Sequence, residues 1–273
     1  MKLIFLLFTF VPLFVAIENE IYFGKLLESD LPKFCFHASI LLEEGDTRCN
    51  GAIISSTQIL TSFKCVRYWD YHTRYESKNI SVRVGSIERF NGGIVRQVAS
   101  FKHLPYPLND HIAESDWYKE STRIEFEDLA KLDLIVFTLK DPLPLGPTIC
   151  PIRLAEKEDD IYVKIGTSVE IVGCSTLKRE TIETRELHSI KETISNVTEK
   201  CPQFFFPRTG IYKEEGAPLI VRRKNNLFPK GEPLLLGIVS DGDSFYFSYN
   251  GVVKISAFSG YIMGNKTMPD GRC

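Results

Sequence analysis

The sequence predicts an all-β fold. Beyond residue 16 no 3.6-residue apolar period is sustained, whereas short β-branched or aromatic runs recur between turn residues. The spacing of these runs suits closed barrels or a sandwich. The chain has 273 residues, of which 44% are hydrophobic and 12% aromatic, so it can bury a core and is not a disordered or fibrous protein.

The expected strands are, in order, HASILL (37–42), GAIIS (51–55), QILTS (58–62), ISVRVG (80–85), DLIVFTL (133–139), VEIVG (169–173), APLIV (217–221) and PLLLGIVS (233–240). Each is a short apolar run bounded by turn residues. Only the stretch from Ala257 to Ile262 favours a short terminal helix, and no internal repeat is visible.

The N-terminal run MKLIFLLFTFVPLFVA, residues 1–16, has the features of a signal peptide. It starts with the positive charge of Lys2, ends before a charged segment at Glu18, and is shorter than the ~20 residues that span a bilayer. We therefore expect a secreted, extracellular protein with no membrane association after signal removal. The net charge of 33 − 35 = −2 gives no reason to expect a nucleic-acid partner.

Seven cysteines in an exported chain predict a disulfide framework. No CxxC or HxxxH spacing supports a metal site, and no cofactor is expected. Because seven is odd, one cysteine is left over, either as a thiol or joined to a second molecule. Three sequons, at Asn79, Asn196 and Asn265, are candidate N-glycosylation sites.

Residues 111–131 differ from the rest of the chain. They lack strand patterning and are rich in acidic residues: Glu114, Asp116, Glu120, Glu125, Glu127 and Asp128. This composition predicts an acidic surface loop, which is either a recognition surface or a solvated loop without a partner.

Six blocks in order resemble the trypsin-like serine proteases. Cys49-Asn-Gly-Ala-Ile-Ile-Ser with Gln58-Ile-Leu-Thr-Ser-Phe-Lys-Cys65 resembles CGGSLIS…WVLTAAHC. The other blocks are Ile21-Tyr-Phe-Gly (IVGG), Val82-Arg-Val-Gly (VRLG), Leu132-Asp-Leu-Ile-Val-Phe-Thr-Leu (NDIALLKL), Glu214-Glu-Gly-Ala-Pro-Leu (DSGGPL), and Leu236-Gly-Ile-Val-Ser-Asp-Gly with Gly251-Val-Val-Lys-Ile (LVGIVSWG and GVYTKV). Each match is weak alone, but six in the family's order are a strong indication.

The resemblance implies two six-stranded antiparallel β-barrels with the active cleft between them, followed by a short C-terminal helix. The expected organisation is a signal peptide at 1–16 and one peptidase S1-like domain at 21–264. Within it, the N-terminal barrel covers about 21–140, the C-terminal barrel about 150–256 and the helix about 257–264.

The catalytic positions of the family are altered in this sequence. Proteolysis requires a hydroxyl nucleophile, a neutral imidazole, an orienting carboxylate and backbone oxyanion donors. Only the carboxylate is retained, as Asp133, because the histidine position holds Lys64 and the serine position holds Glu215. Lys213 replaces the glycine that leaves room for the oxyanion.

The substituted residues cannot perform the same chemistry. A lysine ammonium has no lone pair to accept a proton, and Asp133 nearby favours the charged form of Lys64. Glu215 has no proton to remove, and its attack on an acyl group would give a reactive anhydride. We expect Lys64 to pair with Asp133, Glu215 or both. An alternative arrangement, a serine with a deprotonated lysine, would have to use Ser62 or Ser240, which lie in matching blocks.

Activation and specificity positions are altered as well. Glu20 precedes the IVGG-like start, so no tryptic activation site is present, and Glu214 replaces the aspartate that receives the new amine in relatives. Thr209 stands at the position that selects the substrate side chain, and Asp241 replaces an aromatic wall of the pocket.

The resemblance also guides the cysteine pairing. It implies a Cys49–Cys65 disulfide that closes a hairpin, and it makes a Cys174–Cys201 pair plausible. Cys150 is expected to bond a distant segment, with Cys35 and Cys273 as the candidates. Two disulfides of the family are missing, their places holding residues such as Val169, Val221 and Ile211, and Val169 and Val221 have lost cysteines as a pair.

The leading hypothesis is a secreted, catalytically inactive serine protease homologue that acts by binding. Its partner would be another secreted protein, such as an active protease or an inhibitor, for which it serves as a cofactor or decoy. The alternative is a serine-type endopeptidase or hydrolase that uses unorthodox catalytic residues.

Overall fold

The computed structural model describes residues 24–42, 49–63, 65, 80–103, 134–174, 176–177, 186–197, 203–207, 211–212, 215–223, 231–240 and 249–264. Within these ranges strands predominate, and α4 (Ser259–Ile262) is a single helical turn close to the C-terminal end. The predicted all-β class is confirmed. In the same ranges no helix has the length and apolar character needed to cross a membrane.

The first half of the chain forms a closed, antiparallel six-stranded barrel in the order β2-β3-β4-β7-β6-β5. Its strands are β2 (His37–Leu42), β3 (Cys49–Ile53), β4 (Gln58–Thr61), β5 (Ile80–Val84), β6 (Ile94–His103) and β7 (Ile135–Leu139). Alternation of side chains along β5 buries Ile80, Val82 and Val84 and leaves the two residues between them partly exposed. The buried set fills the barrel together with Ile40 and Phe137.

The second half, joined by β1 from the N-terminal end of the described chain, forms a nine-stranded sheet in the order β1-β11-β9-β15-β16-β17-β13-β12, with β8 pairing in parallel with β16. Its strands are β1 (Gly24–Lys25), β8 (Arg153–Leu154), β9 (Ser168–Gly173), β11 (His188–Thr193), β12 (Asn196–Val197), β13 (Gln203–Pro207), β15 (Pro218–Arg223), β16 (Glu232–Ser240) and β17 (Tyr249–Lys254). A separate pair joins β10 (Thr176–Leu177) to β14 (Ile211–Tyr212). The second predicted barrel corresponds to this sheet. Strand β12 follows β11 after two residues, and β11 pairs with β9 whereas β12 pairs with β13, so β9, β11 with β12, β13, β17, β16 and β15 pair in a ring.

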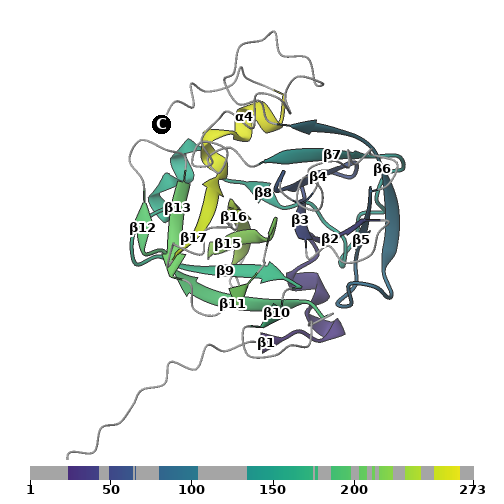
Figure 1. Cartoon of the computed structure of the whole chain (residues 1–273), viewed down its shortest axis with the longest axis horizontal. Coiled ribbons are helices and arrows are strands. Elements are labelled where there is room, and N and C mark those ends of the chain that lie inside the picture. The colour runs from purple at the N-terminus through teal and green to yellow at the C-terminus, as the bar shows by residue number, and fades with distance from the viewer. Residues whose placement is uncertain are drawn as a thin grey trace, which may run out of the picture.

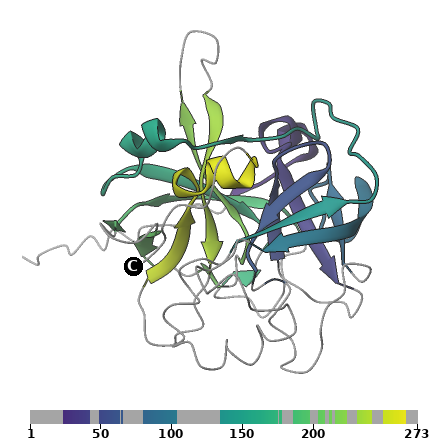
Figure 2. The same ribbon diagram turned by 90° about the horizontal axis from the view of Figure 1, so that it is seen from above.

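The two halves lie side by side, with α4 at the end of the chain next to the first barrel (Figure 1, Figure 2). One hydrophobic cluster crosses the junction and includes Phe36 and Leu134 from the first half and Leu235 and Phe258 from the second. The helical turn is also tied to the first barrel, since Lys102 Nζ of β6 lies 4.0 Å from the centre of the Tyr261 ring. The halves therefore share a continuous core.

Two valines occupy the place of a cysteine pair in the second half. Strands β15 and β9 are antiparallel, with Leu219 opposite Ile171 and Ile220 opposite Glu170. Val169 belongs to the buried core cluster of this sheet, and Val221 packs against the same cluster. Apolar side chains thus stand at both positions where the resemblance implies a lost disulfide.

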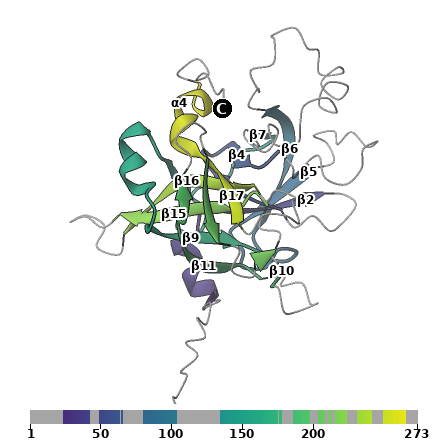
Figure 3. The ribbon, with the colours of Figure 1, turned by 60° about the vertical axis from the view of Figure 1, so that its left-hand side comes forward.

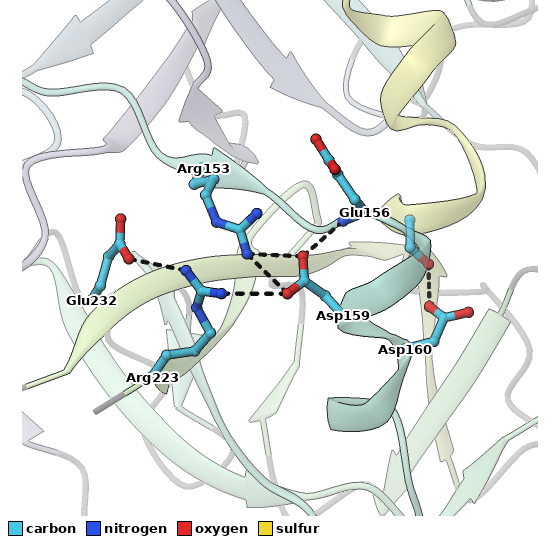
Figure 4. Close-up of polar contacts among 7 residues, drawn as sticks. Arg153, Glu156, Asp159, Asp160, Arg223 and Glu232 are labelled. Atoms are coloured by element: carbon cyan, nitrogen blue, oxygen red, sulfur yellow. Dashed lines mark hydrogen bonds and ion pairs between the residues drawn. The ribbon is translucent and has the colours of Figure 1, made fainter. Parts of the chain in front are cut away.

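A charged network attaches the 3-10 helix η4 (Lys157–Tyr162) to the sheet (Figure 4). Asp159 is largely buried, and its carboxylate accepts two hydrogen bonds from Arg153 Nη2, at 2.9 and 2.8 Å. Arg223 of β15 lies 3.5 Å from the same carboxylate and also pairs with Glu232 of β16 at 3.0 Å. Figure 3 shows this side of the molecule, where η4 contacts η5 (Ile255–Ala257), the 3-10 turn that precedes α4.

Candidate functional site

The turn that contains Glu215 is held against the β3–β4 hairpin. Asn50 N–H donates to the Glu215 carbonyl oxygen at 2.9 Å, and Gly216 N–H donates to the Val239 carbonyl at 2.9 Å. Glu215 is half-buried, and its Oε1 oxygen is buried. The position that the resemblance aligns with the nucleophile therefore lies on a turn fixed between the two halves of the molecule.

Gly216 is required by this turn. Its φ is +76°, a left-handed conformation that glycine adopts without steric cost. A Cβ atom at this position would lie 2.2 Å from the Asn50 carbonyl oxygen and 2.4 Å from Thr61 Oγ1. The backbone after Glu215 can approach the hairpin only because residue 216 has no side chain.

The strands next to the other two triad positions, Lys64 and Asp133, have neighbouring termini at one end of the barrel. Strand β4 ends at Thr61, which lies opposite Ile135, the first residue of β7. The chain leaves β4 three residues before position 64, and it enters β7 two residues after position 133. Both points lie at the same end of the barrel. Lys64 and Asp133 themselves lie outside the described residues.

A disulfide ties the end of β4 to β3. Cys49 and Cys65 are joined as predicted, with their Cα atoms 5.7 Å apart. Cys65 N–H donates to the Ser62 carbonyl at 3.2 Å, which closes a turn immediately after the strand. The residues on either side of position 64, Phe63 and Cys65, are thereby positioned relative to the hairpin.

Behind the Glu215 turn, a buried polar cluster joins the two halves. Asn50 is fully buried, and its Oδ1 lies 3.1 Å from His37 Nε2 and accepts a hydrogen bond from Cys174 N–H at 3.0 Å. Arg89, only 3% exposed, donates to the carbonyl oxygens of Cys174 (3.2 Å) and Cys49 (2.7 Å). Since buried polar groups are costly unless hydrogen-bonded, these contacts fix the junction beneath the turn.

Sequence reasoning missed Asn50 and Arg89. For Asn50 the signal was present, because Asn50 replaces the first glycine of the CGG block and Cys174 replaces the tryptophan of the family's GWG stretch. These two substituted positions contact each other in the structure. Arg89 carries no signal in the sequence, since its partners are backbone carbonyls of residues 40 and 85 positions away.

The two serines considered as alternative nucleophiles are both buried. Ser62 is fully buried and Ser240 is 4% exposed. In the part of the chain that is described, no group of three His, Cys, Asp or Glu side chains could hold a metal ion.

The remaining predicted positions fall largely outside the described residues. These are the oxyanion and activation positions Lys213 and Glu214, the pocket positions Thr209 and Asp241, the sequons Asn79 and Asn265, the N-terminal segment through Ile21, the acidic segment 111–131, and Cys201 and Cys273. Asn196 is described and exposed. Of the two candidates for Cys150, the structure joins Cys35 to it. The Cys174–Cys201 pairing stays a prediction.

In a comparison with known protein families, the family model described as Trypsin matches residues 28–215. The matched region includes the closed barrel and ends at Glu215. No curated protein matches the chain.

Proposed function

Because the chain belongs to the trypsin family, we propose that it is a secreted serine protease homologue that binds a protein partner and does not cleave it. The observation that carries this proposal is the pair of substitutions at the reacting positions, Lys64 for the general base and Glu215 for the nucleophile. An ammonium cannot accept the proton, and a carboxylate cannot be activated as a hydroxyl is.

The described site supports this proposal in two ways. Ser62 and Ser240, the two serines in matching blocks that were considered as replacements for the lost nucleophile, are buried. The Glu215 turn is nevertheless fixed by backbone hydrogen bonds to Asn50 and Val239. The molecule thus keeps a well-packed framework around the altered positions, as a binding protein needs.

Secretion is supported by two disulfides. Cys49–Cys65 lies within the first barrel, Cys35–Cys150 joins the start of that barrel to the segment that leads into the second half, and three of the four cysteines are buried. Structural disulfides form and persist in oxidising compartments. This agrees with the signal-peptide features of residues 1–16.

The partner proposed is another secreted protein, such as an active protease or its inhibitor. The acidic segment 111–131 precedes Asp133 in the sequence, and we propose it as the recognition segment. Its charge would favour a partner with a basic surface, and binding would then weaken as the salt concentration rises.

A substrate screen tests the loss of catalysis. The secreted full-length protein is incubated with a broad peptide library and, separately, with a fluorophosphonate probe for activated serines, with active trypsin as the positive control. We expect no turnover and no labelling. Four matched variants, Lys64→Ala, Glu215→Ala, Ser62→Ala and Ser240→Ala, identify the source of any activity.

Turnover that one of these variants abolishes would overturn the proposal and establish the alternative, a hydrolase with unorthodox catalytic residues. Turnover that all four variants retain comes from a contaminating protease.

Affinity capture from the secreting fluid tests the binding role. The matched control is a variant in which the acidic residues of 111–131 are neutralised. Partners captured equally by both proteins would contradict recognition by this segment.

A further inference from the structure

The sequence contains three Asn-Gly pairs, at positions 50–51, 91–92 and 250–251. In such a pair the backbone nitrogen of the glycine can attack the side-chain amide of the asparagine. Glycine has no side chain that blocks the approach, and the reaction is intramolecular, which favours it over attack by solvent. The structure distinguishes the three pairs by their surroundings.

Two of the pairs lie within paired strands. Gly51 of β3 is paired with residues of both β2 and β4, and Gly251 of β17 is paired with residues of both β13 and β16. Asn50 is also fully buried, and its Oδ1 accepts a hydrogen bond from Cys174 N–H at 3.0 Å. Attack at either position requires the strand to separate from its neighbours, as happens only in local unfolding.

The third pair lies on the turn between β5 and β6 (Figure 1). Asn91, Gly92 and Gly93 are all exposed, so solvent reaches them. Gly92 N–H donates to Asn91 Oδ1 at 2.9 Å, so the attacking nitrogen and the amide that it attacks are already in contact. Because Gly92 lies between the two strands, its nitrogen can react without separating paired strands.

We propose that Asn91 is a site of spontaneous deamidation in the folded protein, and that the isoaspartate product opens the turn between β5 and β6. The Gly92 nitrogen gives its proton to a solvent base and forms a bond to Asn91 Cγ. The Cγ–Nδ2 bond breaks, and the amide nitrogen takes a proton from solvent and leaves as ammonia.

The product of this step is a cyclic succinimide, which water then opens. Addition of water at Cγ breaks its bond to the Gly92 nitrogen and gives aspartate. Addition at the main-chain carbonyl carbon of residue 91 breaks the other bond of that nitrogen and gives isoaspartate. Water is the only co-reactant, and both products carry one additional negative charge. The reaction needs neither catalysis by the chain nor a partner, so it is independent of the proposed function.

Isoaspartate alters the turn more than aspartate does, because its main chain runs through Cβ and Cγ and is one methylene longer. Two hydrogen bonds hold the present turn. Ser86 Oγ donates to the Asn91 carbonyl oxygen at 2.7 Å, and Arg83 Nη1 donates to the Gly92 carbonyl oxygen. In isoaspartate the first of these acceptors becomes a carboxylate outside the main chain, and the added methylene displaces it from the second. The two hydrogen bonds can no longer hold the same turn.

Peptide mapping tests the site. The folded protein is incubated at mildly alkaline pH, reduced, and digested with trypsin at mildly acidic pH, where little further deamidation occurs. The three asparagines fall in the peptides 49–64, 90–96 and 231–254, each of which contains a single asparagine. We expect Asn91 to deamidate at least about tenfold faster than Asn50 or Asn250, because these two react only when strands separate. Equal rates in the folded protein would overturn the proposal.

The denatured, reduced chain is the matched control. Without paired strands, the three Asn-Gly pairs should deamidate at rates within about threefold of one another. An equally large preference for Asn91 in the denatured chain would contradict selection by the fold. The variant Asn91→Gln keeps an amide but would have to form a six-membered ring, so the acidic form seen by ion-exchange chromatography should disappear. An acidic form that persists in this variant would place the main reaction elsewhere.

Opening of the turn is tested by amide hydrogen exchange on the isoaspartate form after its separation. We expect exchange over residues 85–93 to be at least about threefold faster than in the parent. The variant Asn91→Asp, which carries the same charge on an unaltered main chain, should exchange like the parent. Exchange of the isoaspartate form at the parent's rate would refute the opening of the turn, and equally fast exchange of Asn91→Asp would attribute it to charge instead.

Discussion

At the scale of single residues, Gly216 determines how the turn after Glu215 meets the β3–β4 hairpin. Its left-handed φ and the close approach of the Asn50 carbonyl exclude any side chain. The position of Glu215 is thereby set by a neighbouring residue that has no reactive side chain.

We predict that Gly216→Ala lowers the free energy of unfolding by about 2–5 kcal/mol, the sum of backbone strain and steric overlap. Gly146→Ala is the matched control, since no atom lies within 4 Å of a Cβ there and its φ is not positive. Its effect should remain within about 1 kcal/mol. Chemical denaturation measures both, and equal stabilities of the two variants would contradict the role of Gly216.

We also predict that Lys64 and Asp133 form an ion pair at the altered catalytic positions. Thr61, three residues before Lys64, and Ile135, two residues after Asp133, lie opposite each other at one end of the barrel. A double-mutant cycle with Lys64→Met and Asp133→Asn should give a coupling free energy of about 1 kcal/mol if the pair is exposed and about 3–5 kcal/mol if it is buried. A coupling indistinguishable from zero would show that the two side chains do not interact.

At the scale of elements, the two six-residue 3-10 helices begin in the same way. In η1 (Glu28–Lys33) the Asp30 carboxylate accepts a hydrogen bond from Leu27 N–H at 3.0 Å, and in η4 the Asp159 carboxylate accepts one from Glu156 N–H at 3.0 Å. Each aspartate thus satisfies a backbone donor that the helix start leaves unpaired. They differ in burial and in their cationic partners, because Asp30 binds Lys33 near the surface whereas Asp159 is largely buried and binds two partly exposed arginines, Arg153 and Arg223.

We predict that Asp159→Asn lowers the free energy of unfolding by about 1–3 kcal/mol. Removing one member of a buried charge network leaves the remaining charges uncompensated, and the partial exposure of Arg153 and Arg223 reduces the cost from the fully buried value. Asp30→Asn is the control at the equivalent helix position and should cost less. A larger loss for Asp30→Asn, measured by thermal unfolding, would contradict the importance of burial.

The pKa of Asp30 is lowered from its ordinary value of 3.8, chiefly by the hydrogen bond from Lys33 Nζ and further by the one from Leu27 N–H. A carboxyl whose folded-state pKa is depressed stabilises the fold above its unfolded pKa and loses that contribution as the pH falls through its folded pKa. We predict that Lys33→Met raises the pKa of Asp30 toward 3.8. An NMR titration of the Asp30 carboxyl in which the variant and the parent coincide would contradict this.

At the scale of the whole molecule, the Cys35–Cys150 disulfide connects the start of the first barrel to the segment that leads into the second half. Cys150 N–H also donates to the Cys35 carbonyl at 2.9 Å. The bond closes a stretch of 115 residues, whereas Cys49–Cys65 closes 16. In the chain-entropy model the longer closure stabilises more.

We predict that Cys35→Ala/Cys150→Ala lowers the free energy of unfolding by about 5 kcal/mol, and Cys49→Ala/Cys65→Ala by about 3 kcal/mol. Denaturant unfolding of the two double variants, compared with the parent under the same oxidising conditions, measures the difference. The reverse order of stabilities would show that local packing, and not loop length, determines the contribution of each disulfide.

The sequence by itself determined the elements whose apolar residues are close neighbours along the chain. The run HASILL coincides with β2, and the other seven predicted runs overlap β3, β4, β5, β7, β9, β15 and β16. The hairpin disulfide and the family followed from motifs only a few residues long. Strand β11 was not predicted. Its buried positions are His188, Ile190 and Glu192, and because two of these are polar, the sequence shows no apolar alternation.

Only the tertiary structure decided which distant residues meet. It paired Cys35 with Cys150 and placed Asn50 beneath the Glu215 turn and beside Cys174. Local conformational preferences act over a few residues, and a short stretch of sequence records them. Contacts between residues far apart in the chain depend on the packing and hydrogen bonding of the whole fold, so no short stretch of the sequence specifies them.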